Sequence, residues 1–282
     1  MHITEDIFLI VFQHPGSRGM NANAYLITGE KPCLIDTGFD DPNSTSTIVE
    51  AFNQVKVSLE NLALIIGTHA HMDHIGGIPS LKLLSKANIA MHKLEYARMK
   101  DLQLKGTLEQ TKTDRFLEDG EVVDLGKTKL QVILTPGHTS GHICLYEQQR
   151  GILFSGDHII SGTPDGTVYI GPPDGDVSQY IASLNKLLKL ELKMILPGHG
   201  QIIHDPYEKI NSILKHHLDR EKQLISILGS SEKTVEQIAR IIYDRADSTT
   251  IGAVIGRLKK LVNDGSIEVV RKDHLDSYRV RK

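Results

Sequence analysis

The 282-residue sequence contains no tryptophan, only two cysteines and only 5% aromatic residues. Cys33 and Cys144 lie in the apolar runs PCLID and HICLY, so we expect buried thiols rather than a disulfide or a metal-binding pair. Nothing approaches the roughly 18 apolar residues of a membrane-spanning helix, and MHITEDIFLI lacks the basic start of a secretory signal. The sequence therefore predicts a reduced, cytoplasmic protein with no membrane partner.

A strong net charge is also missing. The chain carries 32 Lys and Arg against 35 Asp and Glu, a balance of -3, which by itself does not indicate a partner such as nucleic acid. The charge is unevenly distributed, because residues 207–282 hold 15 basic against 11 acidic residues and residues 1–206 hold 17 against 24. This shift predicts two domains, 1–206 and 207–282.

The first region alternates short apolar runs with loops of Gly, Pro, Asp and His. The runs at 24–28 and 33–38 are typical of two strands joined by a turn, and the runs at 62–69, 129–138, 142–148, 151–158 and 194–200 are typical of strands that adjoin a loop. Helical patterns occur near 44–55, 78–85 and 177–188. This mixture predicts an α/β (α+β) fold. The second region has three helical patterns followed by two short strand-like runs, which indicate a small winged-helix-like domain. Segment 101–119 is polar, and its role stays open between a surface excursion and a lid.

The stretch GTHAHMDHIGG places three histidines and an aspartate directly after an apolar run. Imidazole and carboxylate groups are ligands for zinc and related metals, and four of them on one loop are too close together to surround a single ion. We therefore expect two neighbouring ions, with further ligands from other loops at the same sheet edge. The expected metal ligands are His69, His71, Asp73, His74, His138, Asp157 and His199.

These motifs resemble the metallo-β-lactamase-fold superfamily, whose HxHxDH pattern matches residues 69–74 and whose LIDTG motif matches residues 34–38. The resemblance covers residues 1 to about 205 and implies a four-layer αββα sandwich with a two-metal site. It implies that His69, His71 and His138 hold the first metal, that Asp73, His74 and His199 hold the second, and that Asp157 bridges them. The cofactors would be two divalent ions, most simply zinc, with manganese or iron as substitutes.

Such a pair of ions can activate water as hydroxide at neutral pH, so the expected activity is hydrolysis, with Asp73 orienting the hydroxide or taking its proton. Redox flavo-diiron relatives have glutamate where this sequence has His71, which disfavours reduction of oxygen or nitric oxide. The true lactamases are expected to lack an aspartate at the position of Asp73, which disfavours a drug-degrading role. Asp36 is expected to fix a ligand histidine or to serve a turn, and His142 to support the site or contact substrate. His158 is expected to pack, and His14 and His92 to be structural or surface residues. Residues 161–176 are expected to form a pocket wall or a simple connection.

The C-terminal region resembles that of the β-lactamase-like protein 2 group, whose members act on single-stranded RNA. The resemblance rests on an HRxxRExQIL pattern, which this sequence matches at His216, Arg220, Glu221 and Gln223. The sequence differs from the pattern at His217, where arginine is usual, and at Leu224-Ile225, where Ile-Leu is usual. His216 and Arg220 would then support the site or contact substrate. Basic residues expected to meet phosphates are Arg257, Lys259, Lys260, Arg271, Lys272, Arg279 and Arg281. The alternative interpretation is that these are solvated charges on a tail that only buttresses the catalytic domain or a dimer.

Three functions fit these observations. The first is a phosphodiesterase or endoribonuclease acting on single-stranded nucleic acid. The second is a hydrolase of small thioesters, as in glyoxalase II, or of lactones or organophosphates. The third is a DNA-binding regulator, which the intact ligand set disfavours. Aromatic residues for base stacking are scarce after Tyr207, where Tyr243 and Tyr278 are the only ones.

Overall fold

The computed structural model spans residues 1–282 and describes all of them except 14–20, 102–111, 164–167, 273–274 and 282. The contacts between residues divide the chain into two compact units. The first contains 1–135, 141–163 and 190–206, and the second contains 136–140, 164–189 and 207–282. The two-domain boundary at residue 206 stays a prediction.

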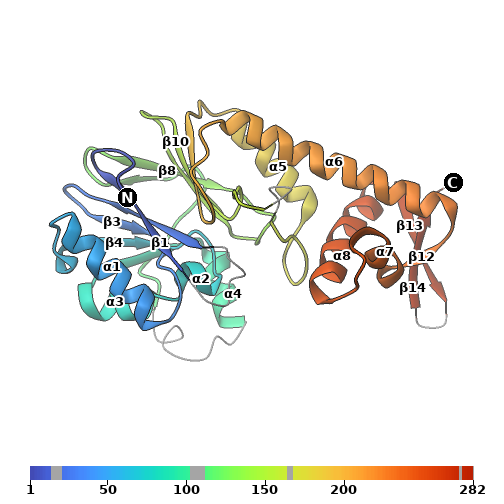
Figure 1. The fold of residues 1–282 in the computed structure, drawn as a ribbon, viewed down its shortest axis with the longest axis horizontal. Helices are drawn as coiled ribbons and strands as arrows, with labels where there is room; N and C mark the ends of the chain where they lie inside the picture. Colours follow the sequence, from blue (N-terminus) through green and yellow to red (C-terminus); the bar gives the residue numbers. More distant parts are fainter. Residues whose placement is uncertain (14–20, 102–111, 164–167, 273–274, 282) are drawn as a thin grey trace. The chain divides into compact units, whose positions relative to one another are not determined.

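The first unit is built on two mixed β-sheets (Figure 1). The first sheet has the order β1-β2-β3-β4-β5-β6, with parallel pairing from β3 onward. Its strands are β1 (Ile7–Phe12), β2 (Ala22–Ile27), β3 (Cys33–Ile35), β4 (Leu64–Ile66), β5 (Asn88–Met91) and β6 (Arg115–Phe116). The second sheet has the order β11-β10-β9-β8-β7, in which only β10 and β11 are parallel. Its strands are β7 (Val122–Asp124), β8 (Lys129–Leu134), β9 (Ile143–Glu147), β10 (Ile152–Gly156) and β11 (Met194–Pro197).

Alternation along the strands of the first sheet buries both of its faces. Ile7 and Leu9 of β1 join a core that contains Leu145 and Phe154 of the second sheet, so the two sheets pack face to face. The intervening residues of β1 join a second core with side chains of the outer helices, among them Ile48. These helices are α1 (Pro42–Gln54) and α3 (Ile78–Ser85), and they cover the outer face of the first sheet (Figure 1). Period-two side-chain alternation is what places a strand between two cores.

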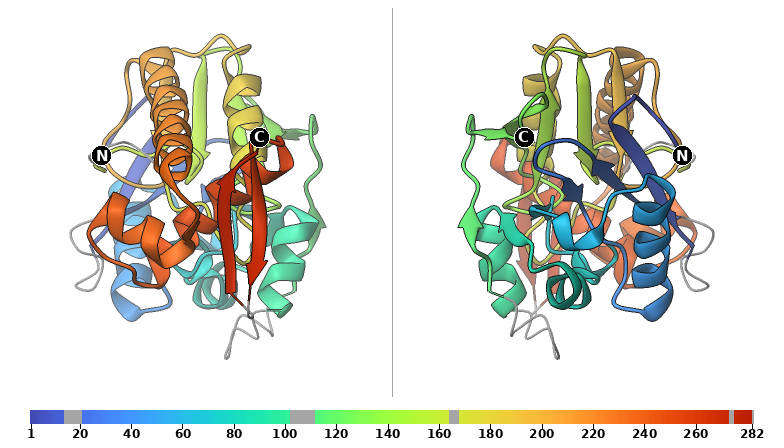
Figure 2. Two further views of the ribbon diagram at one scale, coloured as in Figure 1. Left: turned by 90° about the vertical axis from the view of Figure 1, so that its right-hand side faces the viewer. Right: turned by 90° about the vertical axis from the view of Figure 1, so that its left-hand side faces the viewer.

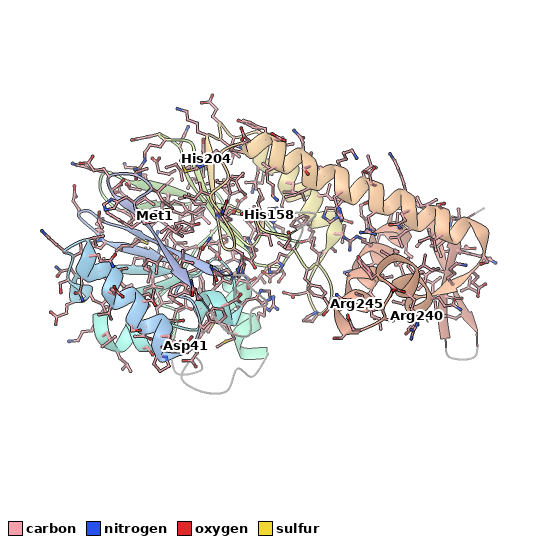
Figure 3. All side chains as sticks on the ribbon, viewed as in Figure 1. Met1, Asp41, His158, His204, Arg240 and Arg245 are labelled. Atoms are coloured by element: carbon pink, nitrogen blue, oxygen red, sulfur yellow. The ribbon has the colours of Figure 1, made fainter. Side chains whose placement is uncertain are left out.

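The remaining helical pieces of the first unit are short. They are η1 (Leu59–Asn61), α2 (Met72–Ile75) and α4 (Lys93–Asp101). Asp41 stands at the beginning of α1, where its carboxylate accepts hydrogen bonds from the backbone N–H groups of Asn43 and Ser44 (Figure 3). This side-chain cap explains why α1 begins two residues before the predicted start at Ser44.

The second unit contains four helices and a three-stranded sheet among its described residues. They are α5 (Val177–Leu187), α6 (Pro206–Ser230), β12 (Lys233–Thr234), α7 (Val235–Tyr243), α8 (Ser248–Asn263), β13 (Ile267–Lys272) and β14 (Leu275–Val280). The sheet order is β12-β14-β13, and β13 and β14 run side by side (Figure 2). Leu224, Ile238 and Leu258 bring α6, α7 and α8 together in one apolar core. Thr234 and Asp247 cap α7 and α8 with reciprocal side-chain bonds.

Two of the basic residues that were expected to bind phosphates are not accessible to them. Arg257 is 7% exposed and donates to the carbonyl of Ala253, and Lys260 is enclosed between the carboxylates of Glu221 and Asp264. The prediction was wrong for these two because a helical pattern does not show which side chains turn inward. No helix among the described residues is long and apolar enough to cross a bilayer.

Candidate metal centre

The loop after β4 carries four of the predicted ligands. The strand ends at Ile66, the chain is still extended at His71, and α2 begins at Met72. His69 and His71 therefore extend from the loop, whereas Asp73 and His74 extend from the single turn of helix. This change of backbone direction lets side chains close in sequence approach a common point from different sides.

The other predicted ligands follow strands of the second sheet. His138 follows β8, Asp157 follows β10 directly, and His199 follows β11. Together with the loop after β4 they form two sets of donor atoms, each within 4.8 Å of one another: His69, His71, His138 and Asp157 in one, and Asp73, His74 and His199 in the other. His138 comes from the short segment 136–140 of the second unit, which is joined at both ends to the first unit.

The ring nitrogens within each set face each other. Nε2 of His69 lies 2.8 Å from Nδ1 of His71, and Nε2 of His74 lies 3.2 Å from Nε2 of His199. Asp157 reaches both sets, because its carboxylate lies 4.0 Å from Nε2 of His69 and 3.3 Å from Nε2 of His74. A single carboxylate therefore stands between the two groups of histidines.

Most of these histidines have their second ring nitrogen turned to an oxygen of the protein. Nδ1 of His69 lies 3.1 Å from Oγ1 of Thr68, and Nδ1 of His199 lies 3.0 Å from the carbonyl of Asn21. In the second unit, Nδ1 of His138 lies 2.9 Å from the carbonyl of Tyr169. Such partners fix ring orientation and leave the other nitrogen facing the centre.

Asp36 of the LIDTG motif supports the third histidine of the loop. Its carboxylate lies 2.8 Å from Nδ1 of His74 and accepts hydrogen bonds from the backbone N–H and hydroxyl of Thr68. Asp36 is 2% exposed and has a φ of 59°, a left-handed conformation that costs a non-glycine residue about 1–2 kcal/mol. The strain and the three bonds indicate a positioning role at the site rather than a plain turn.

Glu95 of α4 joins two ligand-bearing loops, and sequence reasoning missed it. Its side chain is fully buried and accepts hydrogen bonds from the backbone N–H of Ala70 at 2.7 Å and of Gly141 at 2.8 Å. Ala70 lies between two ligand histidines, and Gly141 follows the loop of His138. No local pattern in HKLEYARM distinguishes this glutamate from an exposed helical residue.

Comparison with known proteins agrees with this geometry. The sequence model of the Metallo-beta-lactamase superfamily matches residues 17–199. The chain belongs to this superfamily. A Beta-lactamase-like protein 2 homolog from Caenorhabditis elegans is 31% identical over 98% of this chain and 90% of its own length. An Atrochrysone carboxyl ACP thioesterase from Aspergillus fumigatus is 24% identical over 93% of this chain and 77% of its own length.

The solved structures agree on the fold. The crystal structure of a metallo-beta-lactamase family protein from Thermus thermophilus has a TM-score of 0.85 and 20% identity, over 99% of this chain and 100% of that one. The expected αββα fold of the superfamily is thereby confirmed, together with C-terminal helices and a small sheet. The chain is accordingly a metallo-β-lactamase-fold hydrolase with a dinuclear His/Asp metal site.

Neighbouring charges and hydrogen bonds shift the pKa values of three of these ligands. Burial acts to raise the pKa of Asp73, but the hydrogen bond to His199 and the charge on His74 outweigh it and lower the pKa to about 2. Burial acts to lower the pKa of His199, but Asp157 and Asp73 raise it to about 10. The pKa of Asp157 lies well below its ordinary range, because His74 and His199 overcome its burial. The carboxylates thus create a negative potential that favours cations between these side chains.

The donor set fits divalent transition-metal ions. Imidazole nitrogens and carboxylate oxygens are ligands for zinc, manganese and iron. The facing ring nitrogens, 2.8 and 3.2 Å apart, need a proton or a metal between them, because two lone pairs at this separation repel. Among the ligands, His71 and Asp73 are half-buried and the other five are buried.

Other predicted residues have clear positions. His142 is fully buried; its Nε2 accepts from the backbone N–H of Asp157 at 3.1 Å and its Nδ1 lies 2.9 Å from Oγ1 of Thr135. It therefore supports Asp157, and its other predicted role, contact with substrate, stays a prediction. His158 is fully buried, which agrees with the packing prediction, and His92 is 3% exposed. His14 lies outside the described residues, as does most of the segment 101–119.

His216 and Arg220 lie on α6. His216 is half-buried and its ring contacts that of His217, with 5.8 Å between centroids. Arg220 donates to Oε1 of Gln223 at 2.7 Å and its guanidinium lies 5.3 Å from the ring centre of Tyr243. Both residues thus have contacts inside the second unit, and their role at the site stays a prediction. The same holds for the pocket wall expected from 161–176, of which 164–167 are not described.

Proposed function

We propose that this superfamily hydrolase cleaves phosphodiester bonds, with short single-stranded RNA as its polymeric substrate. The observation that carries the proposal is the Asp157 carboxylate, which lies close to histidines of both donor sets. A shared carboxylate supports two adjacent ions, and paired ions suit an in-line displacement at phosphorus because each can stabilise one of the two oxygens that enter and leave. Zinc is the simplest occupant for these donors.

The residues at this centre would have different roles in hydrolysis. A pair of ions held by the two donor sets would supply an activated water and polarise the scissile ester. Asp73 is half-buried, and its Oδ2 lies 3.2 Å from Nε2 of His199. From this position Asp73 would orient the attacking water or take its proton. Asp36 and His142 hold His74 and Asp157 in place.

The second unit supports a winged-helix-like assignment. From α6 to β14 its order is helix, strand, two helices and two strands, which includes the three helices and the final pair of strands expected for that module. Several of its basic side chains have acidic partners: Lys259 with Asp176 at 3.5 Å, and Arg279 with Glu268 at 2.7 Å. These pairs reduce the net positive field, so the unit contributes less to phosphate binding than its count of lysines and arginines indicates.

A thioester substrate is the second candidate. It is favoured by the relative named Atrochrysone carboxyl ACP thioesterase, which covers most of this chain. The same donor sets would polarise a thioester carbonyl as well as a phosphoryl group. The DNA-binding regulator is disfavoured, because a protein without catalysis has no need to keep seven ligands in place.

A comparison of substrates separates the candidates. Zinc-loaded protein is offered bis-nitrophenyl phosphate, a fluorescent single-stranded RNA and a lactoyl thioester, each in parallel. Cleavage of the two phosphodiesters is expected, and it should be lost in His71→Ala. His204→Ala is the matched control, because His204 is an exposed histidine outside the donor sets (Figure 3). Thioester turnover with intact phosphodiesters would contradict the proposal and favour the second candidate.

A further inference from the structure

His138 is the ligand that the second unit contributes to the first donor set. Nδ1 of His138 lies 2.9 Å from the carbonyl oxygen of Tyr169. One residue earlier in the loop, the carbonyl of Gly137 accepts a hydrogen bond from the backbone N–H of Asp176 at 2.8 Å. A carbonyl beside one ring nitrogen of a ligand histidine sets the orientation of the ring. The position of the segment 169–176 therefore determines how His138 faces its donor set.

Two glycines of α8 allow this segment to approach the helix closely. Gly252 and Gly256 are both buried and lie one helical turn apart, on the same face of α8. A Cβ atom added at Gly256 would lie 2.6 Å from the carbonyl oxygen of Ile170, and one added at Gly252 would overlap the hydroxyl of Tyr169. Packed atoms do not come this close to one another, so a side chain at either position would force the segment away from the helix.

A charge pair extends the contact along the same face of α8. Lys259 lies about one further turn along the helix, and its Nζ is 3.5 Å from Oδ2 of Asp176. Asp176 also begins α5, where its carboxylate accepts a hydrogen bond from the backbone N–H of Gln179 at 3.0 Å. The segment is therefore held against α8 at both of its ends, and at the two glycines this face of the helix is covered by the protein's own chain.

We propose that Gly252 and Gly256 are positioning residues of the metal centre, because they let α8 support the segment whose Tyr169 carbonyl orients His138. The inference goes beyond the proposed function, since it concerns how a metal ligand is held and applies to a phosphodiester and a thioester alike. It gives the C-terminal region a role that requires no contact with the substrate.

Gly256→Ala tests this support. The new methyl group meets the backbone carbonyl of Ile170, which cannot swing aside as the end of a side chain can, so the segment has to shift and the ring of His138 has to turn with it. Cobalt(II) binds the same kinds of ligand as zinc, and its visible absorption spectrum reports their number and geometry. We expect Gly256→Ala to change that spectrum and to lower zinc affinity about 10–100-fold, as for other groups that orient ligand histidines. Gly229→Ala is the matched control, since Gly229 lies in the helix α6 and an added Cβ there comes within 4 Å of no described atom outside its own stretch of helix.

Gly171→Ala repeats the test from the opposite side of the contact, because a Cβ atom at Gly171 would lie 2.7 Å from the carbonyl oxygen of Gly252. It provides the result if Gly256→Ala does not fold, and failure of both variants to fold would overturn the inference, since the contact would then serve the fold itself. A lower Tm with an unaltered cobalt spectrum and zinc affinity would also overturn it, because α8 would then contribute stability alone. A changed spectrum in variants of a protein that turns over only the thioester supports this inference and contradicts the proposed function alone.

Discussion

Replacing Glu95 with glutamine tests how the ligand loops are held. In the native side chain, each carboxylate oxygen accepts one backbone N–H, from Ala70 and from Gly141. Glutamine keeps one acceptor and turns an NH₂ group toward the other N–H. One charge-assisted hydrogen bond in a buried place contributes about 1.5–3 kcal/mol, and a buried donor without an acceptor adds to the loss, so we expect Glu95→Gln to lower the free energy of unfolding by about 2–3 kcal/mol. For a domain of this size that corresponds to a fall in Tm of about 4–12 °C.

The assay is thermal and urea unfolding followed by circular dichroism, together with a zinc titration of the folded protein. Because the two loops carry ligands, we also expect zinc affinity to fall by about 10–100-fold, as for other residues that orient metal ligands. Glu118→Gln is the matched control: Glu118 is an exposed carboxylate paired with Lys93, and exposed pairs contribute about 0–1 kcal/mol. A Tm and a zinc affinity equal to those of the unaltered protein would refute the reasoning that Glu95 fixes these loops.

Three further changes follow from the site. Asp157→Ala should abolish hydrolysis while circular dichroism shows a retained fold, and turnover in this variant would contradict the two-metal centre. Asp36→Asn should weaken zinc binding about 10–100-fold by releasing His74, as measured by competition with a chromogenic chelator. In metal-free protein, His199 has a pKa raised from 6.5 to about 10, so its stabilising contribution is complete below pH 6.5 and is lost as pH approaches 10. Urea unfolding of His199→Gln at both limits measures this; an equal effect of the substitution at each pH would contradict the assignment.

The loop ligands could be predicted because their chemistry is local in the sequence. The HxHxDH motif follows an apolar run, and the runs before His138, Asp157 and His199 are also strands, so the edge at which these ligands meet follows from the strand pattern. The helix predicted at 78–85 begins and ends at those residues. Periodicity and turn residues are sufficient for such elements, because each depends on its own stretch of chain.

Contacts between distant segments could not be predicted in the same way. Glu95 lies on a short polar helix, and only the packing of that helix beside the ligand loop gives it a role. Arg257 was expected on a surface and is buried, because the side of a helix that faces its neighbours depends on packing of the whole unit. The strand β1 was missed, although Ile7–Phe12 is an apolar run of the same kind as those of the predicted buried strands.

Metal stoichiometry tests the central claim most directly. Elemental analysis of protein purified without added chelator, and again after saturation with zinc, should give two ions per chain, one for each donor set. The first set is disrupted by His71→Ala and the second by His199→Ala, so each variant should keep about one ion if the sets bind separately. A single ion per chain in the saturated unaltered protein, lost entirely in either variant, would contradict a dinuclear centre.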